Sequence, residues 1–215
     1  MSKSIKLTVA GCIIFITLCI VLLVNKVTSM PLLSPEQLQL QGTYILKTPR
    51  TLSEISLTSH DNKAFTNKEL KGKWTVMFFG YTSCPDICPT TLTELKQLKL
   101  KLSEEYTDIA EKINYVFVSV DPGRDSIEQL SNYVPYFDKD FLGVTGDLKS
   151  IYNLANQLNI PFSPVVNPKD ENYLVDHSGN LIVINPMGDY HAFIKPPLNT
   201  DKLVAVMNSI VGNFN

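Results

Sequence analysis

The sequence predicts an α/β domain built on a mixed sheet with helices on both faces, preceded by one N-terminal transmembrane helix. An uncharged apolar run covers residues 7–24 and predicts the membrane helix. From residue 51 onward, strand-like and helix-like segments alternate without an internal repeat, which predicts the α/β domain. The roughly 165 residues after residue 50 suit one domain that buries about two-thirds of its unfolded surface, so one core suffices.

The apolar run is long enough for a single membrane span. A helix over residues 7–24 measures about 27 Å, close to the roughly 30 Å of a hydrocarbon core. No small-x-small cleavage site follows the run, so we expect an anchor that is not removed. Lys3 and Lys6 before the run, against Lys26 after it, predict a cytoplasmic N-terminus with the rest of the chain on the other side.

A tether is predicted between this anchor and the domain. Residues 28–50 contain several prolines and glutamines and show no sustained apolar period. The predicted organisation is therefore an anchor over residues 1–27, a tether over 28–50 and a domain over 51–215.

The first part of the domain predicts a hairpin, a short helix and a buried strand. Residues 55–58 and 64–65 form the expected hairpin, around the polar turn at residues 60–62. Thr66 is a candidate cap for a short helix that ends at Gly72. Residues 74–80, WTVMFFG, have the composition of a buried strand.

The remainder predicts alternating helices and strands. Leucines at three- and four-residue steps predict a long amphipathic helix, with Thr91 and Glu94 as its capping box. Asp125 and Glu128 have the same capping-box spacing. The other expected elements are a strand over 114–120, a helix from Asp147 toward Leu158, a strand pair over 181–185 and 190–194, and a helix over 200–211.

Charge and motif content exclude several classes of function. Nineteen Lys and Arg residues against twenty-one Asp and Glu residues give a net charge of -2, so nucleic acid is not an expected partner. The chain shows no Ser-His-Asp arrangement and no phosphate-binding glycine loop.

The candidate reactive groups are Cys84 and Cys88, between the strand that ends at Gly80 and the long helix. The positive end of a helix dipole favours thiolates, which attack disulfides and bind metals, so both thiols are expected to be reactive. Pro85 and Pro89 fit a loop or a first helical turn, and a pair of inert buried cysteines is the alternative.

The spacing of the two cysteines favours a bound metal. It exceeds the C-x-x-C spacing of ordinary dithiol oxidoreductases, although a disulfide between the two is feasible. Two thiolates match copper(I) or zinc, but structural zinc normally takes four protein ligands, whereas copper(I) needs two or three. The third ligand must come from elsewhere in the chain.

His177 is the candidate third ligand. It lies between the strand-like residues 173–176 and the turn-forming residues 178–180. From there its imidazole could point across the sheet edge toward the cysteine loop, with Asp176 setting its tautomer. On the residues alone, a histidine that only completes the turn is an equal alternative. The other two histidines are expected to serve packing or the surface: His60 and His191.

The segment VSVDPGRD, residues 118–125, places charged residues after a strand that could border the same edge. Turn chemistry at residues 121–123 and helix capping by Asp125 explain it without a metal, so no ligand is assigned there.

Three segments together resemble the Sco/SenC family of membrane-anchored copper proteins. They are FGYTSCPDICPTTL at 79–92, VSVDP with the following RD at 118–125, and YLVDHS at 173–178. The resemblance covers the chain from about residue 50 to its end and includes the single N-terminal anchor. Ser83 stands where many relatives have histidine, a position outside the family's known ligand set.

The resemblance implies a thioredoxin-like, three-layer fold and copper, as Cu(I) or Cu(II), bound by Cys84, Cys88 and His177. It also implies a role in assembling the copper A centre of cytochrome c oxidase subunit 2, by donating copper, by reducing the cysteines of that subunit, or both. A copper metallochaperone and a thiol-disulfide oxidoreductase with Cys84 and Cys88 as its dithiol both remain open, because both need the same thiolates. A peroxidase-like redox sensor is a third class.

The N-terminus is short and basic and lacks an Arg-rich, Ser-rich transit peptide. We therefore expect a protein of the bacterial inner membrane whose domain faces the periplasm. Its expected partners are oxidase subunit 2 and an upstream periplasmic copper donor.

Overall fold

The computed structural model describes residues 3–28, 31–163 and 172–214. The chain divides into two compact units, Met1–Leu32 and Leu33–Asn215. In the first unit, helix α1 runs over Lys3–Thr28, and the side chains of residues 7–21 are exposed. Within the described residues, no helix has the combination of length and apolar character that a membrane crossing requires.

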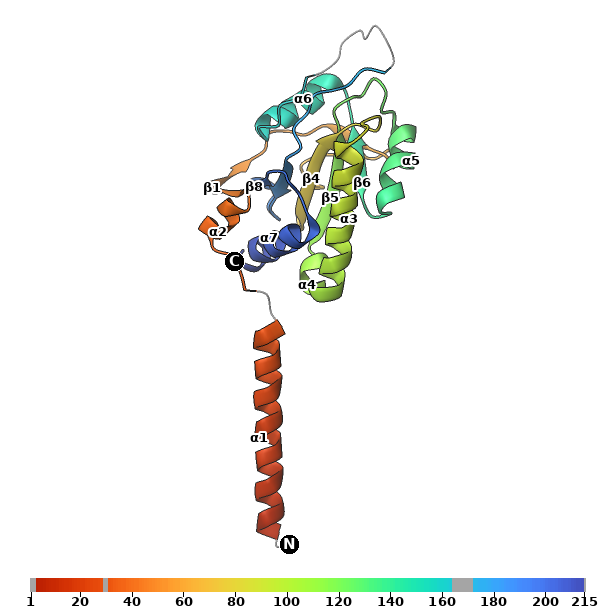
Figure 1. The fold of residues 1–215 in the computed structure, drawn as a ribbon. Helices are drawn as coiled ribbons and strands as arrows, with labels where there is room; N and C mark the ends of the chain where they lie inside the picture. Colours follow the sequence, from red (N-terminus) through yellow and green to blue (C-terminus); the bar gives the residue numbers. More distant parts are fainter. Residues whose placement is uncertain (1–2, 29–30, 164–171, 215) are drawn as a thin grey trace. The chain divides into compact units, whose positions relative to one another are not determined.

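The second unit is built on one mixed sheet (Figure 1). Among the described residues, eight strands form it in the order β1-β8-β7-β4-β5-β6-β2-β3. The bounds of the strands are β1 Thr43–Thr51, β2 Leu57–Ser59, β3 Ala64–Phe65, β4 Trp74–Gly80, β5 Ile113–Ser119, β6 Leu142–Thr145, β7 Leu181–Ile184 and β8 Asp189–Ile194. The predicted mixed sheet is therefore confirmed.

Parallel pairing at the centre of the sheet decides where the site can form. β4 pairs parallel with β5, and Gly80 lies opposite Ser119 in the register. β5 pairs parallel with β6, and the remaining neighbours pair antiparallel. Every position of β4 and of β7 is buried, which requires cover on both faces of the sheet. Because β4 and β5 are parallel, the segments that follow these two strands start at the same edge of the sheet.

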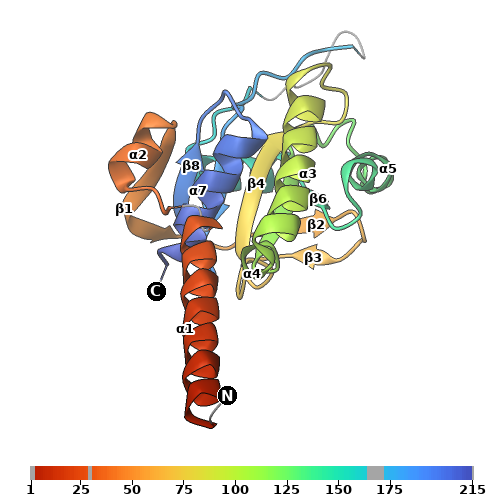
Figure 2. The same cartoon turned by 60° about the horizontal axis from the view of Figure 1, so that its bottom comes forward.

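Helices α3 and α7 lie side by side over the sheet, and β4 is visible between them in the second view (Figure 2). The predicted leucine stripe of α3 faces the core, since Leu92, Leu95, Leu98 and Leu102 are all buried. The remaining helices of this unit complete the cover. The bounds of the helices are α2 Pro35–Leu40, α3 Ile87–Glu105, α4 Thr107–Ala110, α5 Ile127–Phe137, α6 Leu148–Gln157 and α7 Thr200–Gly212.

The predicted tether is wrong for residues 35–50, which contain α2 and most of β1. A capping box between Ser34 and Gln37 starts α2. β1 pairs antiparallel with β8 at the edge of the sheet, and most of its side chains are exposed or half-buried. An edge strand of this kind takes its hydrogen bonds from a distant part of the chain, so no apolar period marks it in the sequence.

Two predicted helix starts are also wrong. α3 begins at Ile87 rather than at Thr91, and Thr91 is buried inside the helix. α5 is capped by the Ser126 hydroxyl, which accepts a hydrogen bond from the Gln129 backbone N–H at 3.1 Å. Residues 66–72 form turns instead of the predicted short helix. The predicted hairpin, central strands, Asp147-capped helix, C-terminal strand pair and last helix are confirmed within a few residues.

Truncation of the α3 leucine stripe tests this packing. Leu98 is fully buried, so Leu98→Ala should lower the free energy of unfolding by about 2–5 kcal/mol, through lost burial and the cavity left behind. Leu100 lies on the same helix and is 44% exposed, so Leu100→Ala should change it by no more than about 0.5 kcal/mol. Urea denaturation measures both values. Equal losses in the two variants would show that α3 packs through a different face.

Candidate metal centre

Two cysteines and one histidine from separate parts of the chain meet at the edge where β4 ends. The Sγ atom of Cys88 lies 3.4 Å from Nε2 of His177, and the Sγ atom of Cys84 lies 4.0 Å from the same nitrogen. The three ligand atoms all lie within 4.8 Å of one another. The structure thus brings together the three residues that the sequence indicates as candidates.

The end of β4 sets the positions of both cysteines. A turn follows the strand, and within it the Cys84 backbone N–H donates to the Tyr81 carbonyl at 3.2 Å. Cys88 is the second residue of α3. Its sulfur packs so closely on Gly80 that a Cβ at that glycine would lie 2.6 Å from Sγ. Glycine is therefore required at position 80 for Cys88 to reach the site, because the Cβ atom of any other residue would displace the sulfur.

A short antiparallel bridge holds His177. His177 pairs with Phe162 in an isolated bridge rather than ending the expected strand. The Ser163 backbone N–H donates to the Asp176 carbonyl at 2.8 Å, and the Ser178 N–H donates to the Pro161 carbonyl at 3.1 Å. The edges of two aromatic rings then pack on the imidazole: Phe78, with a centroid distance of 6.0 Å, and Tyr81, with one of 5.6 Å.

The imidazole turns Nε2 toward the sulfurs. Its other ring nitrogen, Nδ1, lies 3.3 Å from the backbone carbonyl of Ser178. A proton on Nδ1 satisfies this contact and leaves the Nε2 lone pair facing the sulfurs. The backbone therefore orients the ring where Asp176 was the expected partner, and the Asp176 side chain is exposed. The Nε2 lone pair could coordinate a metal without any change of the ring position.

Burial sets the charge of the site before a metal binds. Desolvation raises the pKa of the Cys88 thiol well above its ordinary value, so this cysteine is not the activated thiolate expected at a helix N-terminus. Burial outweighs the helix dipole there, since Cys88 is fully buried. Desolvation likewise lowers the pKa of His177 below its ordinary 6.5. The site therefore holds a neutral thiol at Cys88 and, at neutral pH, a neutral imidazole.

The donor set suits a soft metal ion of low coordination number. Two sulfurs and one imidazole nitrogen match copper(I), which accepts two or three ligands. Structural zinc normally takes four protein ligands, and the cluster found among the described residues supplies three. Both cysteines are free thiols in the structure, so both sulfurs are available to a metal or to a disulfide partner.

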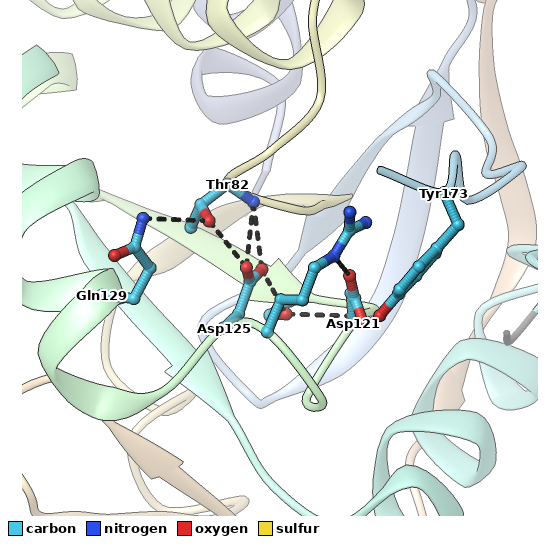
Figure 3. Close-up of polar contacts among 7 residues, drawn as sticks. Thr82, Asp121, Asp125, Gln129 and Tyr173 are labelled. Atoms are coloured by element: carbon cyan, nitrogen blue, oxygen red, sulfur yellow. Dashed lines mark hydrogen bonds and ion pairs between the residues drawn. The ribbon is translucent and has the colours of Figure 1, made fainter. Parts of the chain in front are cut away.

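Asp125 is a residue of this site that sequence reasoning missed. Its buried carboxylate accepts hydrogen bonds from the Thr82 backbone N–H at 3.0 Å, the Thr82 hydroxyl at 2.7 Å and the Ser119 hydroxyl at 2.7 Å (Figure 3). The interpretation of Asp125 as a helix cap is therefore wrong, because its side chain holds the turn at residues 81–84 instead. The signal that could have found it is its position after β5, since parallel strands end at a common edge.

The lowered pKa of His177 predicts a pH dependence of stability. Below about pH 6.5 the unfolded chain protonates this histidine while the folded protein resists, so the folded state loses stability as the pH falls. His177→Gln should lose less unfolding free energy than the wild-type protein between about pH 7.5 and 5.5. Urea denaturation of both proteins at both pH values measures the difference. His191, whose pKa desolvation also lowers, is present in both proteins and cancels in the comparison.

The charged and titratable groups facing His177 remain the same in this comparison. They include the Cys84 and Cys88 thiols, the Tyr81 phenol and the charge of Asp176. Identical pH dependence in the two proteins would show that the imidazole is not desolvated as the structure indicates.

Comparisons with known proteins show which proteins this chain resembles. A bacterial protein from Stutzerimonas stutzeri, named for copper binding, is 36% identical over 169 residues, which cover 79% of this chain and 81% of the relative. The crystal structure of yeast Sco1 with copper bound matches with a TM-score of 0.72 and 29% identity, over 78% of this chain and 91% of the yeast chain. The copper-bound structure of Arabidopsis thaliana ScoI matches with a TM-score of 0.67 and 34% identity, over 74% of this chain and 98% of that one.

The likeness extends over nearly the whole second unit, and these structures share its mixed α/β architecture, which confirms the expected thioredoxin-like fold. The family model described as SCO1/SenC matches residues 45–212, and the chain therefore belongs to the SCO1/SenC family.

Proposed function

We propose that this protein is a copper metallochaperone that binds one copper ion through Cys84, Cys88 and His177. The observation that carries the proposal is the convergence of these three ligand atoms within 4.8 Å of one another. Copper is the metal that two sulfurs and one nitrogen favour, and it is the metal bound in the two matched Sco structures.

The accessibility of the site supports delivery of copper rather than permanent storage. Cys88 is fully buried, whereas Cys84 is 9% exposed and His177 is half-buried, so a partner can approach from one side. A thiol of that partner can replace one ligand of the copper at a time, which transfers the ion without releasing it to water. The acceptor is the copper A centre of cytochrome c oxidase subunit 2, and the donor is an upstream periplasmic copper protein.

Membrane anchoring by the N-terminal segment completes this proposal. The apolar, uncharged residues 7–24 support it, as does the helical conformation of Lys3–Thr28. Anchoring in a bacterial inner membrane, with the domain on the periplasmic side, raises the effective concentration of the copper site near a membrane-bound oxidase.

A thiol-disulfide oxidoreductase is the second candidate, because Cys84 and Cys88 are free thiols whose sulfurs lie within 4.8 Å of each other. In that reaction the two thiols form a disulfide and pass two electrons and two protons to a disulfide of subunit 2, which becomes a dithiol. His177 is dispensable for this chemistry and necessary for the three-ligand copper site.

Copper titration of the reduced protein tests the principal proposal. The wild-type protein should bind one copper ion, and Cys84→Ser and His177→Ala should each weaken binding by roughly a hundredfold or more, because each removes a ligand of the metal. Cys12→Ser serves as the matched control, since Cys12 is an exposed cysteine of α1. Competition with a chromophoric Cu(I) chelator measures the affinities.

Wild-type affinity in Cys84→Ser or His177→Ala would show that the ligand set is wrong. Turnover of disulfide substrates by fully active His177→Ala protein, together with restored oxidase assembly in a deletion strain, would favour the oxidoreductase. Loss of oxidase assembly in the same variant would favour copper delivery.

Anchoring makes a separate prediction. The full chain should remain in the membrane pellet after extraction at alkaline pH, because residues 7–24 bury their apolar side chains in lipid. A chain that begins at residue 29 should appear in the soluble fraction. Immunoblotting of both fractions measures the distribution, and extraction of the full chain along with the shortened one would exclude the anchor.

A further inference from the structure

A partly buried cluster of polar side chains lies beside the three candidate ligands. Asp121, in the loop that follows β5, is 5% exposed. Its Oδ1 atom accepts a hydrogen bond from the Tyr173 hydroxyl at 2.7 Å, and its Oδ2 atom lies 2.5 Å from Nε of Arg124 (Figure 3). The Arg124 guanidinium lies 3.6 Å from the ring centroid of Tyr173 and 5.4 Å from that of Tyr81. We call Asp121, Arg124 and Tyr173 the clamp.

The clamp joins the two segments that carry the ligands. Tyr173 belongs to the segment that leads to His177, and Tyr81 begins the turn that leads to Cys84. The turn at residues 81–84 is called the cysteine turn. The same β5–α5 loop also holds this turn through hydrogen bonds between Asp125 and Thr82. One loop of the chain therefore contacts both ligand segments through part-buried, directional hydrogen bonds.

Other contacts between these two segments include apolar packing, the contacts of His177 Nε2 with the two sulfurs, and backbone hydrogen bonds of Tyr81 with Val175 and of His177 with Phe79. The Tyr81 ring packs edge-on against the His177 imidazole, and Gly179 lies so close to Ile87 that a Cβ there would come within 2.7 Å of Cδ1. Packing of this kind holds the segments together but tolerates sliding, whereas hydrogen bonds to a carboxylate fix direction and distance. The backbone–backbone hydrogen bonds on either side of His177 go to Pro161 and Ser163.

We propose that Asp121, Arg124 and Tyr173 are positioning residues that hold the His177 segment in register with the cysteine turn, although none of them contacts the metal. The proposal rests on the proposed copper site and adds what keeps its two halves together. Metal affinity depends on such supporting contacts because ligands that are already in place lose little freedom on binding.

The test compares the wild-type protein with Tyr173→Phe, which loses only the hydroxyl, with Asp121→Asn, and with the double variant. Tyr136→Phe is the matched control, because this tyrosine of α5 is 82% exposed. In the copper-free protein, nuclear Overhauser contacts between the His177 and Tyr81 rings should weaken in the clamp variants and persist in the control. Cu(I) should dissociate about tenfold faster from each single clamp variant.

Coupling between the residues separates positioning from general weakening. If the clamp acts as one unit, the double variant should release copper no more than about twofold faster than either single variant. Arg124→Lys keeps the charge but loses the planar guanidinium, so it should also accelerate release. It provides a second test if either of the other variants does not fold.

Unchanged ring contacts and wild-type copper release in Tyr173→Phe would overturn the proposal. Additive effects of Tyr173→Phe and Asp121→Asn would also overturn it. If the wild-type protein itself bound no copper, the proposed function would fail, whereas the ring contacts in the copper-free protein would still decide whether the clamp positions His177.

Discussion

The parallel pairing of β4 with β5 is the constraint on which the rest of the site depends. It places Gly80 opposite Ser119, so the cysteine turn and the loop after β5 start side by side at one edge of the sheet. Asp125 can then accept hydrogen bonds from Thr82 across 43 residues of sequence. A shift of the register by one residue would reverse the faces of one strand and would separate these loops.

The second constraint is the unequal burial of the ligands, because both cysteines are buried whereas His177 is half-buried. Cys88 is fully buried against Gly80, and this burial raises the pKa of its thiol and keeps it protonated before a metal binds. A metal must displace that proton, so binding is coupled to proton release. Cys84 is 9% exposed, and His177 is half-buried. The geometry therefore combines one inaccessible sulfur with two ligands that keep some exposed surface.

Copper delivery and disulfide reduction use the same two sulfurs, so the sulfurs alone do not distinguish between them. His177 makes the difference, because its orientation by the Ser178 carbonyl directs a lone pair at the sulfurs. A dithiol reductase has no need of that arrangement, whereas a three-ligand copper site does. Membership in the SCO1/SenC family and the copper-bound relatives agree with a three-ligand copper site.

The sequence by itself determined the elements whose signals are local: the apolar run of β4, the leucine stripe of α3 and the Asp147 cap of α6. It also indicated the two cysteines and His177 as the residues that bear the chemistry, and the family resemblance joined them into one site. Only the tertiary structure decided that residues 35–50 contain α2 and most of β1, that α3 starts at Ile87, and that Asp125 holds the cysteine turn. For β1 and Asp125, the stabilising partners are β8 and Thr82, which lie far away in the sequence, and no local pattern records contacts that exist only after the sheet has formed.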